Sequence, residues 1–521
     1  MALSIQEPGS STPPASKILA LGIDLGTTHS LVSAFDGQKT RLLPLCTPTE
    51  QEALQLKSRF LMPSLVGHKD GQFCAGFKAR LLQQKEPHKV AHSIKRLMGA
   101  SFDDEAARTY PWPLQDDATQ GLCLDFDGML QTPTALATLL LTLLKQRAEA
   151  ALGYPVSKAV ITTPAYFDER ARTATRKAAE DADFDVLRLI SEPTAAALAY
   201  GLDEGLEGLY GVYDLGGGTF DFSLLSMQKG VFNVQGTGGD TLLGGDDIDK
   251  ALYQQMQQSV PNVKTPTRAQ QNALRLRLKA AKEALFEQDE VTVAATDDAP
   301  DFALSRQVLQ QCAAPLITQT LKLTKDVLDE ARVDTKSLQG IILVGGATRT
   351  FGLRQKVESF FKQSTLSSLD ADHVVAMGAA RQAHALVCGG NHLLLDITPL
   401  TLGLETMGGA VEPLIKRNTR IPTLATQTFT TAQNNQKALR IHVLQGEGKA
   451  VDACRSLAHF DLCDLPPLDA GQARIKVTFA LDRDGLLTVS AEEKTTGRTQ
   501  KVAIKPSYGL SLDMAKKLLT A

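Results

Sequence analysis

Two glycine-rich segments of this chain carry side chains that are suited to bind phosphate. One is DLGTT, residues 24–28, and the other is DLGGGT, residues 214–219. Glycine allows backbone N–H groups to approach a phosphate closely, threonine adds a hydroxyl donor, and aspartate can hold a hydrated Mg²⁺ ion. Each segment could therefore form half of a phosphate clamp.

The two segments share one design. Taken singly, each is equally consistent with an ordinary β-turn in which glycine supplies a positive φ. In both, however, an apolar β-like run leads into the aspartate and a second β-like run follows the threonine. We interpret this repeat as two hairpins that grip the β- and γ-phosphates of one nucleotide from both sides of a cleft. The chain has no GxxxxGK[ST] segment, so a P-loop is not expected.

A third apolar run ends in VGGATR, residues 344–349. It is either a plain strand-to-helix turn or a place where the backbone approaches a nucleoside, with Arg349 against the base.

The elements that must position these turns alternate along the first three quarters of the chain. From residue 17 to about 386, short apolar runs alternate with helical stretches such as 133–152 and 268–287. This order predicts α/β layers. After Gly389 and Gly390 the pattern changes to a period of two with tight turns, which predicts an antiparallel β domain. Between them lies Leu393-Leu394-Leu395-Asp396, which is either the first strand of that domain or a linker that docks in one conformational state.

Charge, apolar runs and cysteine spacing exclude several classes of function for this chain. Lys and Arg number 55 against 58 Asp and Glu, a net charge of -3, so a nucleic-acid partner is not expected. The longest apolar run, residues 135–144, is about half of the roughly 20 residues that cross a bilayer and predicts a buried helix.

The N-terminus lacks a basic segment followed by an apolar one, so we expect a cytoplasmic protein without a membrane partner. Seven cysteines without a CxxC pair predict reduced thiols rather than a metal cluster.

Over residues 19–510 the chain resembles the DnaK-like seventy-kilodalton heat-shock chaperones. The motifs that carry the resemblance are IDLGTT (23–28), IKRLMG (94–99), SEPTAAALAYGLD (191–203), YDLGGGTFD (213–221), VGGATR (344–349), PLTLGLETMGG (399–409) and IHVLQGE (441–447). The segments 230–247, 454–462 and 505–510 look most like the bacterial branch that serves iron–sulfur cluster assembly.

The resemblance implies a division of the chain. After residues 1–16, whose Ser, Pro and Gly content predicts a mobile tail, it predicts a duplicated two-lobed actin-like nucleotide-binding domain at 17–388 and an interdomain linker at 389–396. A β-sandwich substrate-binding domain follows at 397–510, and 511–521 would be a short helical remnant of the family's lid. Without a lid, peptide exchange should be fast.

The resemblance also implies roles for single residues in ATP hydrolysis. The catalytic set is Lys95, Glu192, Asp214, Thr219 and Asp221, with Mg²⁺ held through water by Asp24 and Asp214. The remaining nucleotide-binding residues are Gly26, Thr27, Thr28, Gly216, Gly217, Gly218, Lys282, Gly345, Gly346, Arg349 and Asp372. Without the resemblance, Lys95 is better explained as a solvated surface lysine.

Two further sets follow from the resemblance. Pro164, Arg172 and residues 393–396 match the relay between the domains. A peptide cleft would be formed by Leu404, Met407, Phe429, Ala432, Leu439 and Ile441, although without the resemblance these read as β-domain core. The implied partners are a J-domain co-chaperone and an iron–sulfur scaffold protein or another client peptide, and we expect a monomer that binds ATP and ADP with Mg²⁺.

The chain departs from the family pattern at the adenosine side. Lys282 fits, but Lys279 and Phe286 replace the usual Glu and Ser, and His29 replaces Asn or Tyr. We therefore expect weaker nucleotide binding than in general-purpose relatives. Because 291–306 is shorter than in relatives that use an exchange factor, ADP release without such a factor is expected.

Other functions remain open at this point. A general lidless folding chaperone shares every residue named above. Sugar kinases and filament-forming ATPases also use an actin-like clamp, but neither explains the β domain. A regulatory module that holds nucleotide without hydrolysing it is a further alternative.

Overall fold

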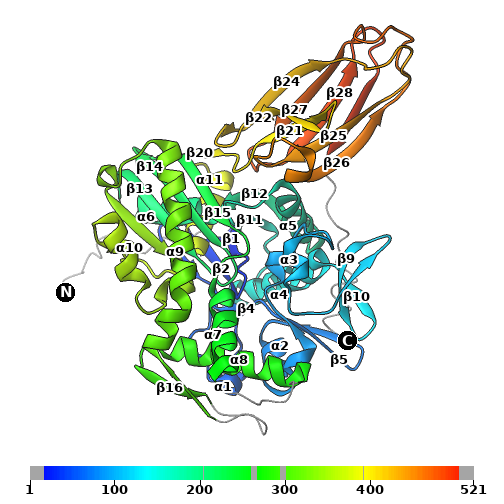
Figure 1. Ribbon diagram of the computed structural model, residues 1–521. Helices are drawn as coiled ribbons and strands as arrows, with labels where there is room; N and C mark the ends of the chain where they lie inside the picture. The colour runs from blue at the N-terminus through cyan, green and yellow to red at the C-terminus, as the bar shows by residue number, and fades with distance from the viewer. Residues whose placement is uncertain (1–16, 204, 260–266, 294–300, 391, 504–521) are drawn as a thin grey trace, which may run out of the picture.

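The computed structural model describes residues 17–203, 205–259, 267–293, 301–390 and 392–503 (Figure 1). The expected tail at 1–16, the expected helical remnant at 511–521 and the middle of the short segment 291–306 lie outside these residues. Two α/β lobes are followed by a β-sandwich that sits against one end of them. The predicted fold class is therefore confirmed.

The first lobe is built on a mixed sheet in the order β12-β11-β1-β2-β3, with β4 also paired to β2. The first predicted phosphate loop is the turn between the antiparallel strands β1 and β2. The strands are β1 (Leu21–Asp24), β2 (His29–Phe35), β3 (Thr40–Leu42), β4 (Met62–Pro63), β11 (Lys158–Thr163) and β12 (Asp185–Ser191).

The apolar run at residues 135–144 lies, as predicted, in a helix of this lobe, α4 (Pro133–Leu152). Thr132 caps its N-terminus by accepting a hydrogen bond from the Ala135 N–H, and Gly153 ends it at φ 80°. Further elements are α1 (Pro48–Leu54), β5 (Val66–Lys69), β6 (Gln72–Ala75), α2 (Gly76–Lys85), η1 (Pro87–Lys89), β7 (Val90–Ala91), η2 (Ile94–Leu97), α3 (Glu105–Arg108), β8 (Leu114–Asp117), β9 (Gly121–Phe126), β10 (Met129–Gln131), α5 (Glu169–Asp181) and α6 (Glu192–Asp203).

The second lobe repeats the hairpin arrangement. Its sheet has the order β19-β18-β13-β14-β15-β20-β23, and the second predicted loop is the turn between the antiparallel strands β13 and β14. The elements are β13 (Gly208–Leu215), β14 (Phe220–Gln228), β15 (Val231–Asp240), α7 (Gly245–Ser259), α8 (Arg268–Ala284), β16 (Glu290–Val293), β17 (Phe302–Ser305), α9 (Arg306–Ala331), η3 (Thr335–Ser337), β18 (Gly340–Val344), η4 (Gly346–Arg349), α10 (Leu353–Phe361), β19 (Thr365–Leu366), α11 (Val374–Cys388), β20 (Leu393–Ile397) and β23 (Arg420–Ile421).

One apolar core joins the two lobes. It combines residues of α6 and α11 with Val160 and Ile190 from the first sheet and Val212 and Leu225 from the second. Gly22 allows α11 to lie directly on β1, since a Cβ there would be 2.0 Å from the Ala380 backbone nitrogen. The lobes are therefore joined through the buried helices α6 and α11, and the two predicted phosphate loops contact each other.

The β-sandwich consists of two four-stranded sheets, β22-β21-β25-β26 and β24-β27-β28-β29. In β27 and β28 buried and partly exposed residues alternate, as the period of two predicts. Its strands are β21 (Leu402–Thr406), β22 (Ala410–Ile415), β24 (Thr423–Phe429), β25 (Leu439–Gln445), β26 (Arg455–Leu462), β27 (Ile475–Leu481), β28 (Leu487–Glu493) and β29 (Thr499–Ala503), with η5 (Val451–Ala453) before β26.

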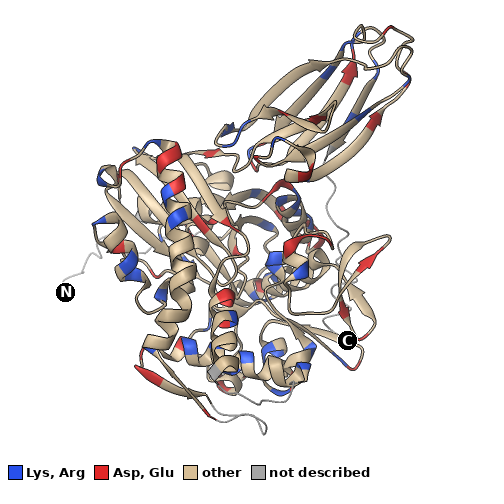
Figure 2. Cartoon of the chain, in the orientation of Figure 1, with Lys and Arg blue, Asp and Glu red and all other residues tan. Residues whose placement is uncertain are grey.

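Charged side chains are mixed over the molecule. In the view of Figure 2, basic and acidic residues are interspersed along both lobes and the sandwich.

Within the described residues, no helix combines the length and the apolar character that crossing a membrane requires.

Candidate functional site

The two predicted phosphate loops touch each other. A Cβ on Gly217 would lie 2.0 Å from the Thr28 hydroxyl oxygen, and one on Gly218 would lie 2.5 Å from the Thr27 methyl carbon. Only glycine allows the second loop to come this close to the threonines of the first. The repeat seen in the sequence therefore forms one composite site.

A cavity of about 450 Å³ opens between the loops. It is lined by both hairpin turns, by the turn after β18 and by the last turns of α8. The predicted residues on its wall are Asp24, Gly26, Thr27, Thr28, Lys95, Glu192, Asp214, Gly216, Gly217, Thr219, Lys282, Gly345, Gly346, Arg349 and Asp372. Its size and its mixture of backbone, hydroxyl and charged groups suit a nucleotide.

Gly218 and Asp221 are not on the wall. The Gly218 carbonyl instead accepts a hydrogen bond from Arg96 Nε at 2.8 Å. Asp221 is buried behind the wall, where its Oδ1 accepts the Tyr166 N–H at 2.8 Å. Burial and then the Glu192 carboxylate raise the pKa of Asp221 to about 7.

A buried lysine faces a cluster of carboxylates at the floor of the cavity. Lys95 Nζ forms an ion pair with Glu192 Oε1, and both side chains are buried. Burial lowers the pKa of Lys95, but Glu192 and Asp24 outweigh it and raise the pKa overall. Lys95 is therefore not the solvated surface lysine that its sequence alone favours.

The aspartates of both loops belong to the same cluster. Burial, followed by the Glu192 charge, raises the pKa of Asp24 to about 7 and also raises that of Asp214. Such crowded carboxylates repel one another, and oxygen donors of this kind are the ligands that Mg²⁺ prefers. Asp24 and Asp214 therefore offer oxygen atoms of the type that binds a hydrated Mg²⁺ ion, although among the described residues no three acidic, His or Cys side chains are grouped to hold a metal directly.

At the other end of the cavity, the basic side chains are held by acidic ones. Lys282 Nζ lies 2.7 Å from Asp249 Oδ1 and donates to the Gly245 carbonyl at 3.0 Å. Arg349 donates to Asp372 Oδ2 at 2.5 Å. These pairs fix the direction of both cations.

The three residues at which this chain departs from the family pattern also line the cavity. Phe286, Lys279 and His29 are all on the wall. Lys279 Nζ lies 3.9 Å from Asp246 Oδ1. Surrounding protein atoms and then the charge of Lys279 lower the pKa of His29, whose side chain is nevertheless exposed at the cavity wall.

Sequence reasoning missed several residues on the wall, among them Lys57, Asp246 and Glu283. Burial raises the pKa of Asp246, but Lys279 and Arg96 outweigh it and hold the pKa at about 2. A signal existed, because residues 244–247 place two glycines and two aspartates at the start of an amphipathic helix. Only the folded chain shows that this helix end meets the cavity.

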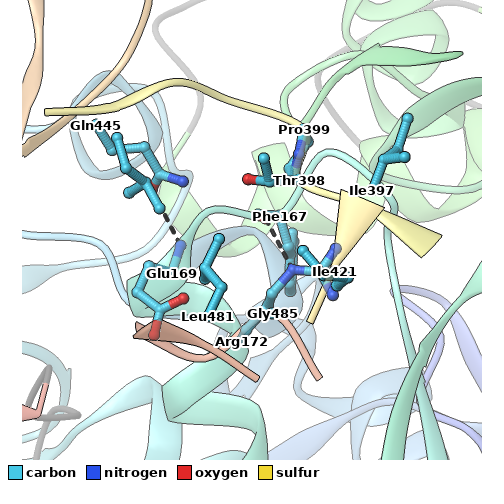
Figure 3. Close-up of a pocket in the computed structure, with 11 residues that line it drawn as sticks. Phe167, Glu169, Arg172, Ile397, Thr398, Pro399, Ile421, Gln445, Leu481 and Gly485 are labelled. Carbon is cyan, nitrogen blue, oxygen red and sulfur yellow. Dashed lines mark hydrogen bonds between the residues drawn. The ribbon is translucent and has the colours of Figure 1, made fainter. Parts of the chain in front are cut away.

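Of the predicted relay residues, Arg172 lines the small cavity where the β-sandwich meets the first lobe (Figure 3). Arg172 donates to the carbonyls of Phe167 and Ala165 at 3.1 and 3.0 Å, which fixes the turn before α5. The Pro164 carbonyl accepts the Phe167 N–H in the same turn. Residues 393–395 form a parallel pair with β15, and Asp396 pairs with Ile421 of β23.

Charged and backbone contacts complete this interface. Arg455 pairs with Asp168 and with Asp104, the latter at 2.8 Å. From the turn between β27 and β28, Asp484 pairs with Arg176 and accepts the Leu189 N–H at 3.2 Å. The sandwich is therefore docked on the first lobe.

The six predicted cleft residues of the sandwich differ in how deeply they are buried. Leu404 and Ile441 are buried in its core, with Phe429 and Leu439 packed partly buried against it. Met407 is 89% exposed, and Ala432 is exposed as well. The structure thus places two of the six at the surface and two within the core.

Comparison with known proteins gives one consistent result. The model of the family described as Hsp70 protein matches residues 20–521. A Bordetella pertussis protein named Chaperone protein HscA homolog is 45% identical over 525 residues, which cover 99% of this chain and 83% of that protein. Proteins of the same name from Methylobacillus flagellatus and Laribacter hongkongensis are each 44% identical, with 83% of each covered.

Proposed function

The chain belongs to the Hsp70 protein family, and we propose that it acts on a peptide segment of the scaffold protein of iron–sulfur cluster assembly. Hsp70 proteins are ATP-dependent chaperones with ATPase activity, and they bind client peptides. The specialised client is supported by the relatives of about 44% identity named HscA homolog and by the resemblance of residues 230–247 and 454–462 to that branch.

The cavity explains how the chain's own residues would promote hydrolysis. Glycine N–H groups and Thr27, Thr28 and Thr219 would donate to the phosphate oxygens. Lys95, charged and fixed by Glu192, would orient the attacking water and offset the developing negative charge. A Mg²⁺ ion held through water by Asp24 and Asp214 would neutralise phosphate charge. No covalent nucleophile is required.

The base would lie between Arg349 and the last turns of α8. Phe286 and Lys279 lack the hydroxyl and carboxylate acceptors that a ribose needs, so we infer weaker ADP binding than in general-purpose relatives. Isothermal titration should give an ADP affinity below theirs, and an equal affinity would contradict this inference.

We propose residues 389–396 as the linker between a nucleotide-binding domain at 17–388 and a substrate-binding domain at 397–510. Docking of this linker would couple nucleotide state to a cleft of Leu404, Met407, Phe429, Ala432, Leu439 and Ile441. Pro164 and Arg172 would relay the change, because they shape the turn under the docked sandwich. A J-domain co-chaperone would accelerate the cycle in a cytoplasmic monomer that releases ADP without an exchange factor.

The decisive experiment is the ATPase rate in the presence of peptides. Peptides from the scaffold protein should accelerate hydrolysis, and a J-domain protein should increase the effect, whereas scrambled peptides should not. Equal stimulation by unrelated unfolded proteins would instead indicate a general folding chaperone. A Lys95→Ala variant that hydrolyses ATP at the normal rate would remove the catalytic assignment.

A further inference from the structure

We propose that Arg96 and Asp247 are positioning residues for ATP hydrolysis, which hold Lys95 at the cavity by tying its turn to the opposite lobe. The inference rests on the proposed catalytic role of Lys95. Neither Arg96 nor Asp247 is on the wall of the nucleotide cavity.

Lys95 lies in η2, a single turn of the first lobe. The next residue, Arg96, reaches across to the second lobe. Its Nη1 donates to Asp247 Oδ1 at 3.4 Å, and its Nη2 forms an ion pair with Asp247 Oδ2. Its Nε donates to the carbonyl of Gly218 in the second phosphate loop at 2.8 Å. One guanidinium thus contacts both α7 and the phosphate loop.

Asp247 is itself fixed on its own lobe. Its Oδ2 accepts the Gly244 N–H at 2.8 Å, just before α7 begins. The Arg96 and Asp247 side chains are only 12% and 21% exposed, so water screens this pair less than a surface pair. The ion pair therefore has a defined geometry.

A second tie lies on the other side of Lys95. Ser93 is buried, has a left-handed φ of 56° and donates to Asp246 Oδ2 at 2.5 Å. Lys95 is therefore flanked by one contact to Asp246 and one to Asp247, both in the first turn of α7. Ser93 just before η2 and Arg96 within it are thus tied to the second lobe, while the Lys95 side chain points to Glu192 of the first.

This arrangement makes Lys95 dependent on closure of the cleft. Lysine has a flexible four-carbon side chain. Its ammonium group therefore keeps a defined position only if the backbone that carries it is fixed. Separation of the lobes would break both ties and leave η2 held by its own lobe alone, where Ile94 and Leu97 are buried in the core. The lysine would then be in position only when both phosphate loops enclose a nucleotide.

The test uses single-turnover hydrolysis of prebound ATP in the full chain. Arg96→Ala and Asp247→Asn should each slow hydrolysis by about 10- to 100-fold, as a misplacement of roughly 1 Å can do. ADP affinity, measured by calorimetry, should change far less. Arg96→Lys, which keeps the charge, should restore part of the rate. Asp329→Asn, in an exposed pair with Lys325 of the second lobe, is the matched control.

A double-mutant cycle separates a positioning role from a structural one. In a Lys95→Ala background, Arg96→Ala should cause no further loss, because the group that it positions is gone. An equal loss in both backgrounds would overturn the inference, as would normal hydrolysis in Arg96→Ala. If Lys95→Ala alone hydrolyses normally, the proposed catalytic role fails instead, and the two failures are distinct. Thermal unfolding of each variant shows whether it is folded.

Discussion

Gly217 lies where the two phosphate loops approach each other, and its neighbour Gly216 does not. A Cβ on Gly217 would be 2.0 Å from the Thr28 hydroxyl, while one on Gly216 would have no neighbour closer than 3.7 Å. The two positions therefore form a matched pair within one loop.

We expect Gly217→Ala to weaken ATP binding by at least about tenfold, because the added methyl group would displace the hydroxyl of Thr28, a proposed phosphate donor. Gly216→Ala should have a small effect by comparison. Calorimetric titration with ATP measures both variants. Equal affinities for the two would show that the loops do not clamp the nucleotide together.

At the scale of one element, β20 is the strand that connects the lobes to the sandwich. It pairs in parallel with β15 and antiparallel with β23. Leu394 is 8% exposed and packs in the core between the lobes, whereas its neighbour Leu393 is 54% exposed. Of these two neighbouring leucines, only Leu394 is therefore buried against the lobes.

We expect Leu394→Asp to undock β20, because it removes about 2 kcal/mol of apolar burial and places a charge in a core. Peptides should then no longer accelerate ATP hydrolysis, while ADP binding persists. Leu393→Asp should retain most of the stimulation. The ratio of ATPase rates with and without peptide measures both, and stimulation that survives Leu394→Asp would argue against a role for β20 in coupling.

At the scale of the whole molecule, a carboxyl group lies buried between the domains. Glu169, in the first turn of α5, is 2% exposed and lines a small cavity together with the apolar side chains of Ile397, Ile421 and Leu481 (Figure 3). Its Oε1 accepts the Leu487 N–H of the sandwich at 2.5 Å, and its own N–H donates to Gln445 Oε1 at 3.1 Å. Arg172, the nearby cation, donates to backbone carbonyls instead.

Burial raises the pKa of Glu169 to about 8, although the Leu487 N–H and Arg172 lower it, while Asp482 and Asp168 raise it further. Undocking would expose the carboxyl and return its pKa to an ordinary value of about 4.3. The docked form thus binds the proton more tightly. Docking is favoured fully below the lower pKa, weakens as the pH rises between the two values and is weakest above the higher one.

We therefore expect the docked population to fall between pH 6 and 8, with the docking constant reduced by roughly one to two orders of magnitude. Small-angle X-ray scattering in the presence of ATP follows this as an increase in the radius of gyration. Glu169→Gln should remain docked across the range, since the amide has no charge to bury. The exposed Glu52→Gln serves as control. A pH profile unchanged by Glu169→Gln would exclude this carboxyl as the cause.

The fold class could be predicted from the amino-acid sequence, and so could the hairpin turns between β1 and β2 and between β13 and β14. Periodicity of two and of 3.6, with glycine at the turns, depends on local interactions, so α4, the β1–β2 and β13–β14 hairpins and the alternating strands of the sandwich could be predicted. Recurrence of one loop design across two halves also indicated a shared ligand.

Which charged side chains are buried, and which groups they face, depends on the tertiary structure. Lys95 looks like a surface lysine in sequence, and it becomes a buried partner of Glu192 because η2 and α6, 97 residues apart, meet at the cavity. The ties from Arg96 to Asp247 and from Glu169 to Leu487 join residues separated by 151 and 318 positions. Burial and long-range electrostatics depend on how whole lobes and domains pack, and no local pattern encodes them.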